Sequence, residues 1–173
     1  MSLRAALPLL VLLAGRPVLA AGPAAVPASP PSVAAVPHPA ARFAGRWQLD
    51  LAHSDMGKPR RATVAREDVI VADGPWLHVR SVAVRAGNDS LKLEYRYRVD
   101  GDAMNTLMGQ EVKTRGHMAG GTLHLDSEAK LLLLTLLVSE HWNVSADGRT
   151  LTLERESRSP LGDEKQKLVF ARR

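Results

Sequence analysis

The chain has 173 residues, a formal net charge of +5 and no cysteine. The lack of cysteine excludes disulfides, thiolate metal sites, a cysteine nucleophile and lipid attachment through a cysteine. Basic residues are scattered, and the adjacent pairs Arg60-Arg61 and Arg172-Arg173 do not form the charge run that is typical of nucleic-acid binding, so no nucleic-acid partner is expected.

The first twenty residues have the three parts of a signal peptide, namely a positive end at Arg4, an apolar run over 5–14 and the small-residue pattern Val18-Leu19-Ala20. The run is about half as long as the roughly 20 residues that a membrane-spanning helix needs. We therefore expect a signal peptide over 1–20 that is cleaved after Ala20, which lowers the net charge from +5 to +3. The mature protein is expected to be periplasmic or secreted, without a transmembrane segment, and the lack of disulfides favours a bacterial periplasm.

Residues 21–41 are rich in alanine, proline, valine and serine, with His38 among them. Prolines recur every few residues and prevent a periodic helix or strand, so this stretch is expected to be a linker. The domain then occupies 42–173 and is long enough to bury a hydrophobic core.

Alternation of apolar and charged residues is the main structural signal in this domain. In 91–99 every odd position is apolar or aromatic and every even one is charged up to Arg98, and weaker alternation recurs at 150–156 and 165–172. This pattern places one face of a strand in the core and the other in water. We expect an all-β domain.

Three Asp-Gly pairs, at Asp73-Gly74, Asp100-Gly101 and Asp147-Gly148, separate these segments as tight hairpin turns would. Eight or nine sequential strands most simply form an antiparallel meander that closes into a barrel, because closure removes exposed edges. A two-sheet sandwich is the alternative, with 53–63 as its crossover. The expected strands are 45–51, 66–72, 76–86, 90–99, 110–118, 121–128, 131–144, 149–158 and 165–172.

The leucine-rich run 131–138 is the place where a helix competes with a strand. Its continuation to Val144 partly alternates and enters an Asp-Gly turn, so we expect one long strand over 131–144. Such an apolar run predicts that both faces of the strand are covered, by the linker, a partner chain or a membrane. It is therefore the candidate surface for a protein partner or a dimer.

The residues Phe43-Ala44-Gly45-Arg46-Trp47-Gln48-Leu49-Asp50 resemble the Gly-x-Trp signature that opens lipocalins and related calycin barrels. The longer pattern is Gly-x-Trp-x-Leu-Asp with Ser54-Asp55 shortly after, followed near the end by the stretch from Trp142 through Asp147-Gly148 to Thr152. Together these are similar to lipocalin-like bacterial exported proteins of unassigned function. The resemblance implies that Gly45 permits close packing and that Trp47 plugs one end of the barrel. It also implies that Arg172 or Arg173 stacks on this indole, a contact that contributes on the order of 0.5–2 kcal/mol.

Little in the sequence indicates catalysis. The six histidines form no recognised metal spacing, and the pair in His124-Leu125-Asp126 is typical of a solvated strand face. The serines lack the Gly-x-Ser-x-Gly context of a nucleophile. We expect no catalytic residue, no metal and no cofactor.

Four side chains are the candidate ligand-binding residues. Glu140 and Trp142 share one face of the expected strand over 131–144, and Tyr95 and Tyr97 share the apolar face of 90–99. A buried glutamate must be paired or have a raised pKa, so Glu140 is a candidate ligand anchor or acid. The alternatives are a salt bridge at a strand end or a β-bulge that turns the side chain to solvent. The aromatic residues either line a cavity or fill the core.

Two functional hypotheses follow. The first is an exported, non-catalytic binding protein that holds a small apolar or amphipathic ligand in its barrel. The second is an envelope protein–protein interaction module or inhibitor with a filled barrel, which requires an exposed apolar patch around Leu132 and Leu137.

Overall fold

The computed structural model describes residues 38–57, 62–87, 89–131 and 134–173. The expected signal peptide, 1–20, and most of the expected linker lie outside the described residues. The described chain begins at His38, at the end of that linker, and enters a short 3-10 helix, η1 (Pro39–Phe43), in which the His38 side chain accepts a hydrogen bond from the Ala40 N–H.

Ten strands follow η1 in the described part of the chain. A second 3-10 helix, η2 (Leu51–His53), lies between the first two strands and is capped by Asp50, whose side chain accepts hydrogen bonds from the backbone of Ala52 and His53. The strands are β1 (Gly45–Leu49), β2 (Thr63–Asp73), β3 (Trp76–Arg85), β4 (Ser90–Arg98), β5 (Asp102–Leu107), β6 (Gln110–Ala119), β7 (Thr122–Leu131), β8 (Leu134–Val144), β9 (Thr150–Ser159) and β10 (Gly162–Arg172).

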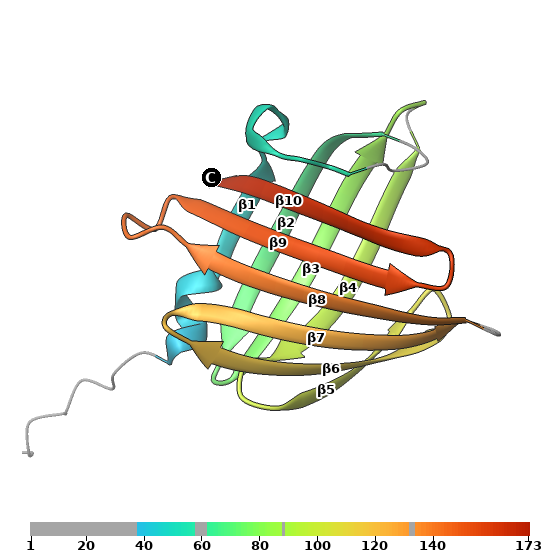
Figure 1. Cartoon of the computed structure of the whole chain (residues 1–173). Helices are drawn as coiled ribbons and strands as arrows, with labels where there is room; N and C mark the ends of the chain where they lie inside the picture. Colours follow the sequence, from blue (N-terminus) through green and yellow to red (C-terminus); the bar gives the residue numbers. More distant parts are fainter. Residues whose placement is uncertain (1–37, 58–61, 88, 132–133) are drawn as a thin grey trace, which may run out of the picture. The chain divides into compact units, whose positions relative to one another are not determined.

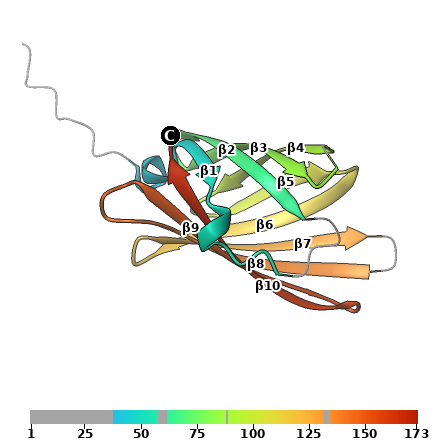
Figure 2. The same ribbon diagram turned by 90° about the horizontal axis from the view of Figure 1, so that it is seen from above.

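The strands form one antiparallel meander that curls into a nearly closed barrel, as Figures 1 and 2 show. The hydrogen-bonded order is β4-β3-β2-β1-β10-β9-β8-β7-β6-β5, so β1 pairs with β10 and the seam lies between β4 and β5. The all-β class, the meander and the barrel are thus confirmed, and the sandwich is wrong. The barrel has one or two more strands than the eight or nine expected, because β5 was not predicted.

Asn105 on β5 bridges the seam. Its side-chain oxygen accepts a hydrogen bond from the backbone N–H of Arg96 on β4 at 2.8 Å, and its amide donates to the Arg96 carbonyl at 2.9 Å. One buried carboxamide therefore satisfies a donor and an acceptor at the edge of β4, where no partner strand is paired.

The leucine-rich run is divided between two strands. β7 ends at Leu131, β8 begins at Leu134, and these two residues are paired across the hairpin. The prediction of one strand over 131–144 is therefore wrong, while Leu132 and Leu133 lie outside the described residues. Leu136 and Val138 alternate with Leu137, whose side chain is 49% exposed, so the described part of this run has one outward face.

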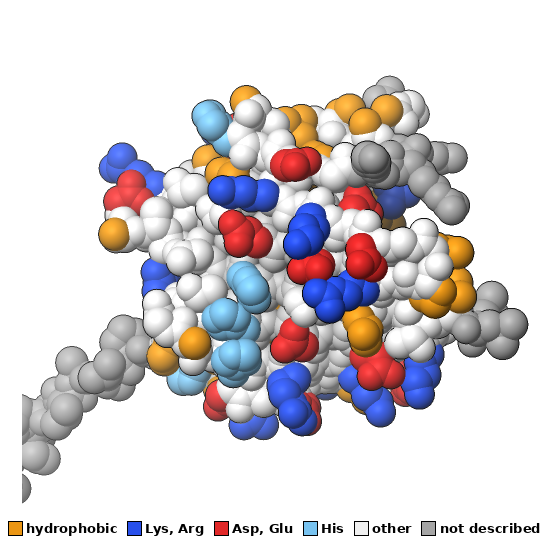
Figure 3. Space-filling model, in the orientation of Figure 1, with side chains coloured by type: hydrophobic (Ala, Val, Ile, Leu, Met, Phe, Trp, Pro, Cys, Tyr) orange, Lys and Arg blue, Asp and Glu red, His pale blue; other side chains and the backbone are white. Residues whose placement is uncertain are grey.

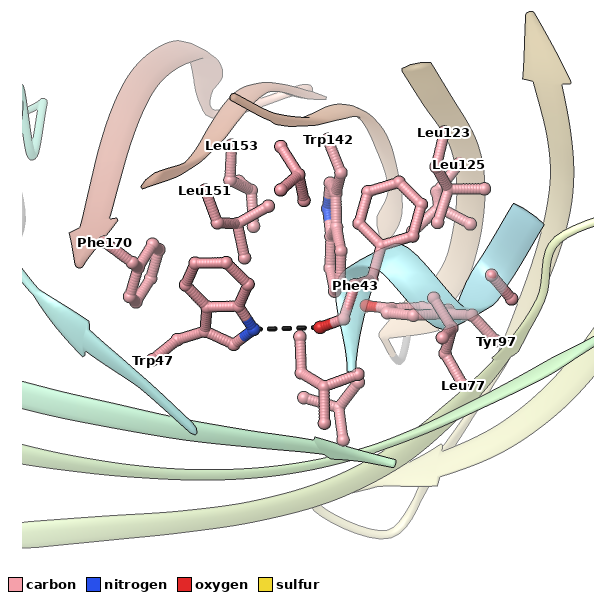
Figure 4. Close-up of a cluster of buried hydrophobic side chains, with 14 of the residues drawn as sticks. Phe43, Trp47, Leu77, Tyr97, Leu123, Leu125, Trp142, Leu151, Leu153 and Phe170 are labelled. Atoms are coloured by element: carbon pink, nitrogen blue, oxygen red, sulfur yellow. Dashed lines mark hydrogen bonds between the residues drawn. The ribbon is translucent and has the colours of Figure 1, made fainter. Parts of the chain in front are cut away.

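The hydrophobic core lies at the η1 end of the barrel (Figure 4). Phe43, Trp47, Trp142 and Phe170 are essentially fully buried there. Complete burial of each such side chain contributes about 1.5–3 kcal/mol. The Trp47 indole N–H donates to the Phe43 carbonyl at 2.8 Å, so the polar edge of this buried ring is satisfied and η1 is fixed to the first strand.

The end of the last strand closes this end of the barrel. The Arg172 guanidinium lies 4.2 Å from the centroid of the Trp47 ring. It also donates to the carbonyls of Ala44 at 2.6 Å, Arg42 at 3.0 Å and Gly148 at 2.6 Å. A single planar side chain therefore joins the N-terminal segment, the β8–β9 turn and the tryptophan.

Gly45 makes room for this arrangement. Its φ of +143° is one that side chains rarely adopt, and a Cβ at this position would lie 2.5 Å from the Arg172 Nη1 atom. The glycine of the Gly-x-Trp pattern is therefore required both for the backbone conformation and for the approach of the arginine.

Candidate ligand-binding site

The barrel interior changes from filled to accessible along its length. On the inward face of β4, Tyr97 is buried at the η1 end, as is Val99 just after the strand, whereas Leu93 and Leu91 at the other end are only half-buried. β8 shows the same gradient, from the buried Val144 to the half-buried side chains of Leu134, Leu136 and Val138. The ends of β7 and β8 that meet across their hairpin lie away from η1 in Figure 1, so the accessible half of the interior, hereafter the open half, is opposite the core.

A layer of polar side chains separates the core from the open half. On β2, the Arg66 guanidinium forms a bidentate ion pair with Asp68, with Nε–Oδ1 and Nη2–Oδ2 distances of 2.9 and 2.7 Å. Burial alone would lower the pKa of Arg66, but the neighbouring Tyr95 and Asp68 raise it above its ordinary value, so Arg66 remains charged.

A second ion pair lies on β8 and β9. Arg155 Nε donates to Glu140 Oε1 at 2.6 Å, and Arg155 Nη2 contacts the same oxygen. The other carboxylate oxygen of Glu140 accepts the Trp142 indole N–H at 3.0 Å. Burial alone would lower the pKa of Arg155, but the neighbouring Glu140 raises it above its ordinary value, so Arg155 remains charged. Glu140 points into the barrel and is not turned to solvent.

Two tyrosines complete the layer. The ring centroids of Tyr95 and Tyr97 are 5.1 Å apart, and Tyr97 lies edge-on to Trp142 at 5.4 Å. Burial raises the pKa of Tyr95 to about 12 and, together with Glu140, raises that of Tyr97 well above its ordinary value. Both phenols therefore keep their protons at neutral pH and can act as hydrogen-bond donors.

The structure brings the four candidate residues, Tyr95, Tyr97, Glu140 and Trp142, into one cluster. No buried side-chain nitrogen or oxygen lacks a hydrogen-bond partner among the residues that the structure describes. The layer is thus a stable floor for the open half.

Three residues of this layer, Arg66, Asp68 and Arg155, were not among the sequence candidates. The alternation of inward and outward side chains along a strand could have indicated them, because Arg66 and Asp68 share a strand face with the buried Ile70. In the same way, Arg155 shares the face of Leu153.

The surface also carries a shallow hollow of about 550 Å³ over the β4–β5 seam. Tyr95 and Asn105 reach it from the inside, but most of its lining side chains belong to the outer face of the barrel. Some of these are charged, such as Arg80 and Glu94, and others are apolar, such as Val71 and Met104. It is therefore an outer groove, and the open half remains the better candidate for holding an apolar molecule.

Histidines form a row on the outer face of the barrel. His117, His124 and His141 lie directly opposite one another on β6, β7 and β8, with ring centroids 4.7 and 4.6 Å apart. Figure 3 shows histidine side chains gathered on this face. Within the described ranges, no group of three or more His, Asp or Glu side chains is arranged to hold a metal ion. His124 has a lowered pKa because of partial burial and its two histidine neighbours.

No model of a known protein family matches the sequence, and no curated protein matches it either. The described residues contain no helix that is long and apolar enough to cross a membrane.

Solved structures show the likeness in fold. A secretory abundant heat soluble (SAHS) protein from Ramazzottius varieornatus is 12% identical and covers 76% of this chain and 96% of its own, with a TM-score of 0.50. The zebrafish ileal bile acid-binding protein, solved with cholic acid, is 14% identical over 76% of this chain and 99% of its own, with a TM-score of 0.48. Fatty-acid-binding protein 1 from Echinococcus granulosus is 10% identical over 76% of this chain and 97% of its own, with a TM-score of 0.45. The described domain has the fold of the calycin-type, lipocalin-like β-barrels.

Proposed function

We propose that this protein is an exported, non-catalytic binding protein that holds a small apolar or amphipathic molecule in the open half of its barrel. The observation that carries the proposal is the gradient of accessibility along the inward faces of β4 and β8. Inward-facing leucines of β4 and β8 remain partly exposed above a polar floor, and small-molecule sites likewise combine apolar walls with a few polar groups.

The driving force for such binding is the removal of these leucines from water. Burial of apolar surface stabilises a complex by about 25 cal/mol per Å² before the entropic cost of association is subtracted. The polar floor adds orientation, because Tyr95, Arg66 and Arg155 offer N–H and O–H groups to the polar end of a ligand.

The non-catalytic part of the proposal rests on the state of the buried carboxylates. Asp68 and Glu140 are each held by an arginine, so neither is poised as a general acid or base. Export rests on the sequence of 1–20, with its basic end at Arg4 and its apolar run over 5–14.

The alternative, an interaction module, required an apolar patch around Leu132 and Leu137. Leu132 lies outside the described residues. Leu137 is 49% exposed, but its cross-strand neighbours are Glu128 and Arg158, which are both charged. A single leucine between charged side chains does not favour a docking patch, and a partner at this strand remains a prediction.

The test compares two adjacent positions of β8. The protein without residues 1–20 is titrated with the neutral apolar dye Nile red, whose fluorescence rises in an apolar site. Leu136→Arg places a charge in the open half and should weaken dye binding at least about tenfold. Leu137→Arg places the same charge on the outer face and should leave binding unchanged. Equal effects of the two variants, or no dye binding by the native protein, would contradict the proposal.

A further inference from the structure

We infer that the ligand of the open half is an uncharged amphiphile whose polar end carries a hydrogen-bond acceptor oxygen, such as an ester, a ketone or an alcohol, and is not a free carboxylate. This inference rests on the proposed function and deepens it. It comes from the charge balance and the orientation of the polar floor.

The floor has no net charge. It contains two guanidinium groups, Arg66 and Arg155, and two carboxylates, Asp68 and Glu140, each paired with the other sign. Further toward the open end, β3 and β10 carry Arg85 and Glu164, again one of each sign. An incoming carboxylate would meet no arginine on the floor that lacks a counter-charge, and its burial would leave an excess negative charge in a poorly solvated interior.

In both ion pairs the carboxylate is more deeply buried than the guanidinium group. Their carboxylates are the deeper partners, with side chains only 3% and 5% exposed for Asp68 and Glu140. Their guanidinium groups are more accessible, at 11% for Arg66 and 28% for Arg155. The guanidinium groups are therefore the more accessible partners of both pairs, and the carboxylates lie behind them.

The two tyrosines add further hydrogen-bond donors to the floor. The raised pKa values of Tyr95 and Tyr97 keep both phenols protonated, and the nearby Glu140 disfavours a second negative charge beside them. A neutral oxygen acceptor can accept from this donor surface without disturbing the balance of charges behind it. A positively charged head group would need an acceptor of its own, and the carboxylates of the floor are already held by Arg66 and Arg155.

The first experiment uses molecules that differ only in their polar ends. Methyl dodecanoate, 1-dodecanol and ionised dodecanoate compete with Nile red for the protein at pH 8, below the critical micelle concentration of each. We expect both neutral compounds to bind at least tenfold more tightly than dodecanoate. Equal or tighter binding of dodecanoate would overturn the inference while leaving the proposed function in place. If Nile red binds but none of the three compounds displaces it, the inference is overturned. If the dye itself does not bind, both the inference and the proposed function are contradicted.

The second experiment changes the charge of the floor. Glu140→Gln keeps the shape of the side chain but leaves Arg155 without its counter-charge, so dodecanoate should bind at least tenfold more tightly than it does to the native protein. Glu94→Gln is the matched control, because it makes the same change on the exposed, outer face of β4. Asp68→Asn frees Arg66 in the same way and serves if the first variant does not fold. Indistinguishable dodecanoate affinities in the floor variant and the Glu94 control would overturn the inference.

Discussion

Replacement of Arg172 by methionine tests how the barrel is closed. The change keeps much of the aliphatic stem but removes the guanidinium that lies 4.2 Å from the Trp47 ring centroid and donates to three backbone carbonyls. Each exposed hydrogen bond contributes about 0.5 kcal/mol at the low end of the usual range, and the cation–π contact contributes about 0.5–2 kcal/mol. We therefore expect the free energy of unfolding to fall by roughly 2 to 3.5 kcal/mol.

The assay is urea unfolding followed by tryptophan fluorescence, with the midpoint and slope fitted separately. Arg173→Met is the matched control, because this neighbour has the same charge, is exposed and is held in the structure through its backbone N–H to the Arg46 carbonyl. Arg172→Lys should be intermediate, since a lysine keeps the charge but cannot reach three carbonyls from one planar group. Equal stabilities of the Arg172→Met and Arg173→Met variants would refute this account of the closure.

Three further predictions concern other parts of the barrel. Asn105→Ala should lower the free energy of unfolding by about 1–2 kcal/mol, because both hydrogen bonds across the seam are lost. It should also speed hydrogen exchange of the Arg96 backbone amide more than that of other amides. Unchanged exchange at Arg96 would argue against this role of Asn105. Gly116→Ala should destabilise the barrel strongly, since the new Cβ would lie 2.0 Å from the Arg98 carbonyl oxygen; native-like thermal stability would show that the backbone yields easily. The lowered pKa of His124 means that the unfolded chain binds a proton at this residue more readily than the folded chain, so the free energy of unfolding should fall as the pH drops below about 6.5. His124→Gln should flatten this pH dependence, measured by urea unfolding at about pH 5 to 8. An unchanged dependence of the free energy of unfolding on pH would count against this role of His124.

The inward faces of several strands could be predicted from the sequence, because a strand places every second side chain on the same face. The alternation in 91–99 correctly places Tyr95 and Tyr97 on one face of β4. β5 could not be found in this way, because Asn105 occupies a core-facing position where the pattern expects an apolar residue.

The division of the leucine-rich run was missed for a different reason. Glycine, asparagine, aspartate and proline are the residues by which tight turns are predicted, and the hairpin between Leu131 and Leu134 has none of them. Composition therefore indicated one long strand where the chain reverses direction.

The candidate site was only half predictable. Glu140 was expected from its position relative to Trp142, but its pairing with Arg155 depends on which strands become neighbours when the barrel forms. The histidine row has the same origin, because residues that are separated in sequence become adjacent through the register of three strands.

The central claim is that the open half of the barrel is the binding site, and the methyl groups of β8 test it most directly. Leu136 and Val138 face the open half, while Leu137 between them faces solvent. The measurement is a methyl-resolved NMR titration of the protein with 1-dodecanol. We predict saturable shifts at Leu136, Val138 and the inward-facing Leu93, with Leu137 unaffected. Shifts confined to Leu137 and other outward-facing methyls, or no saturable shift at any of these positions, would contradict the account.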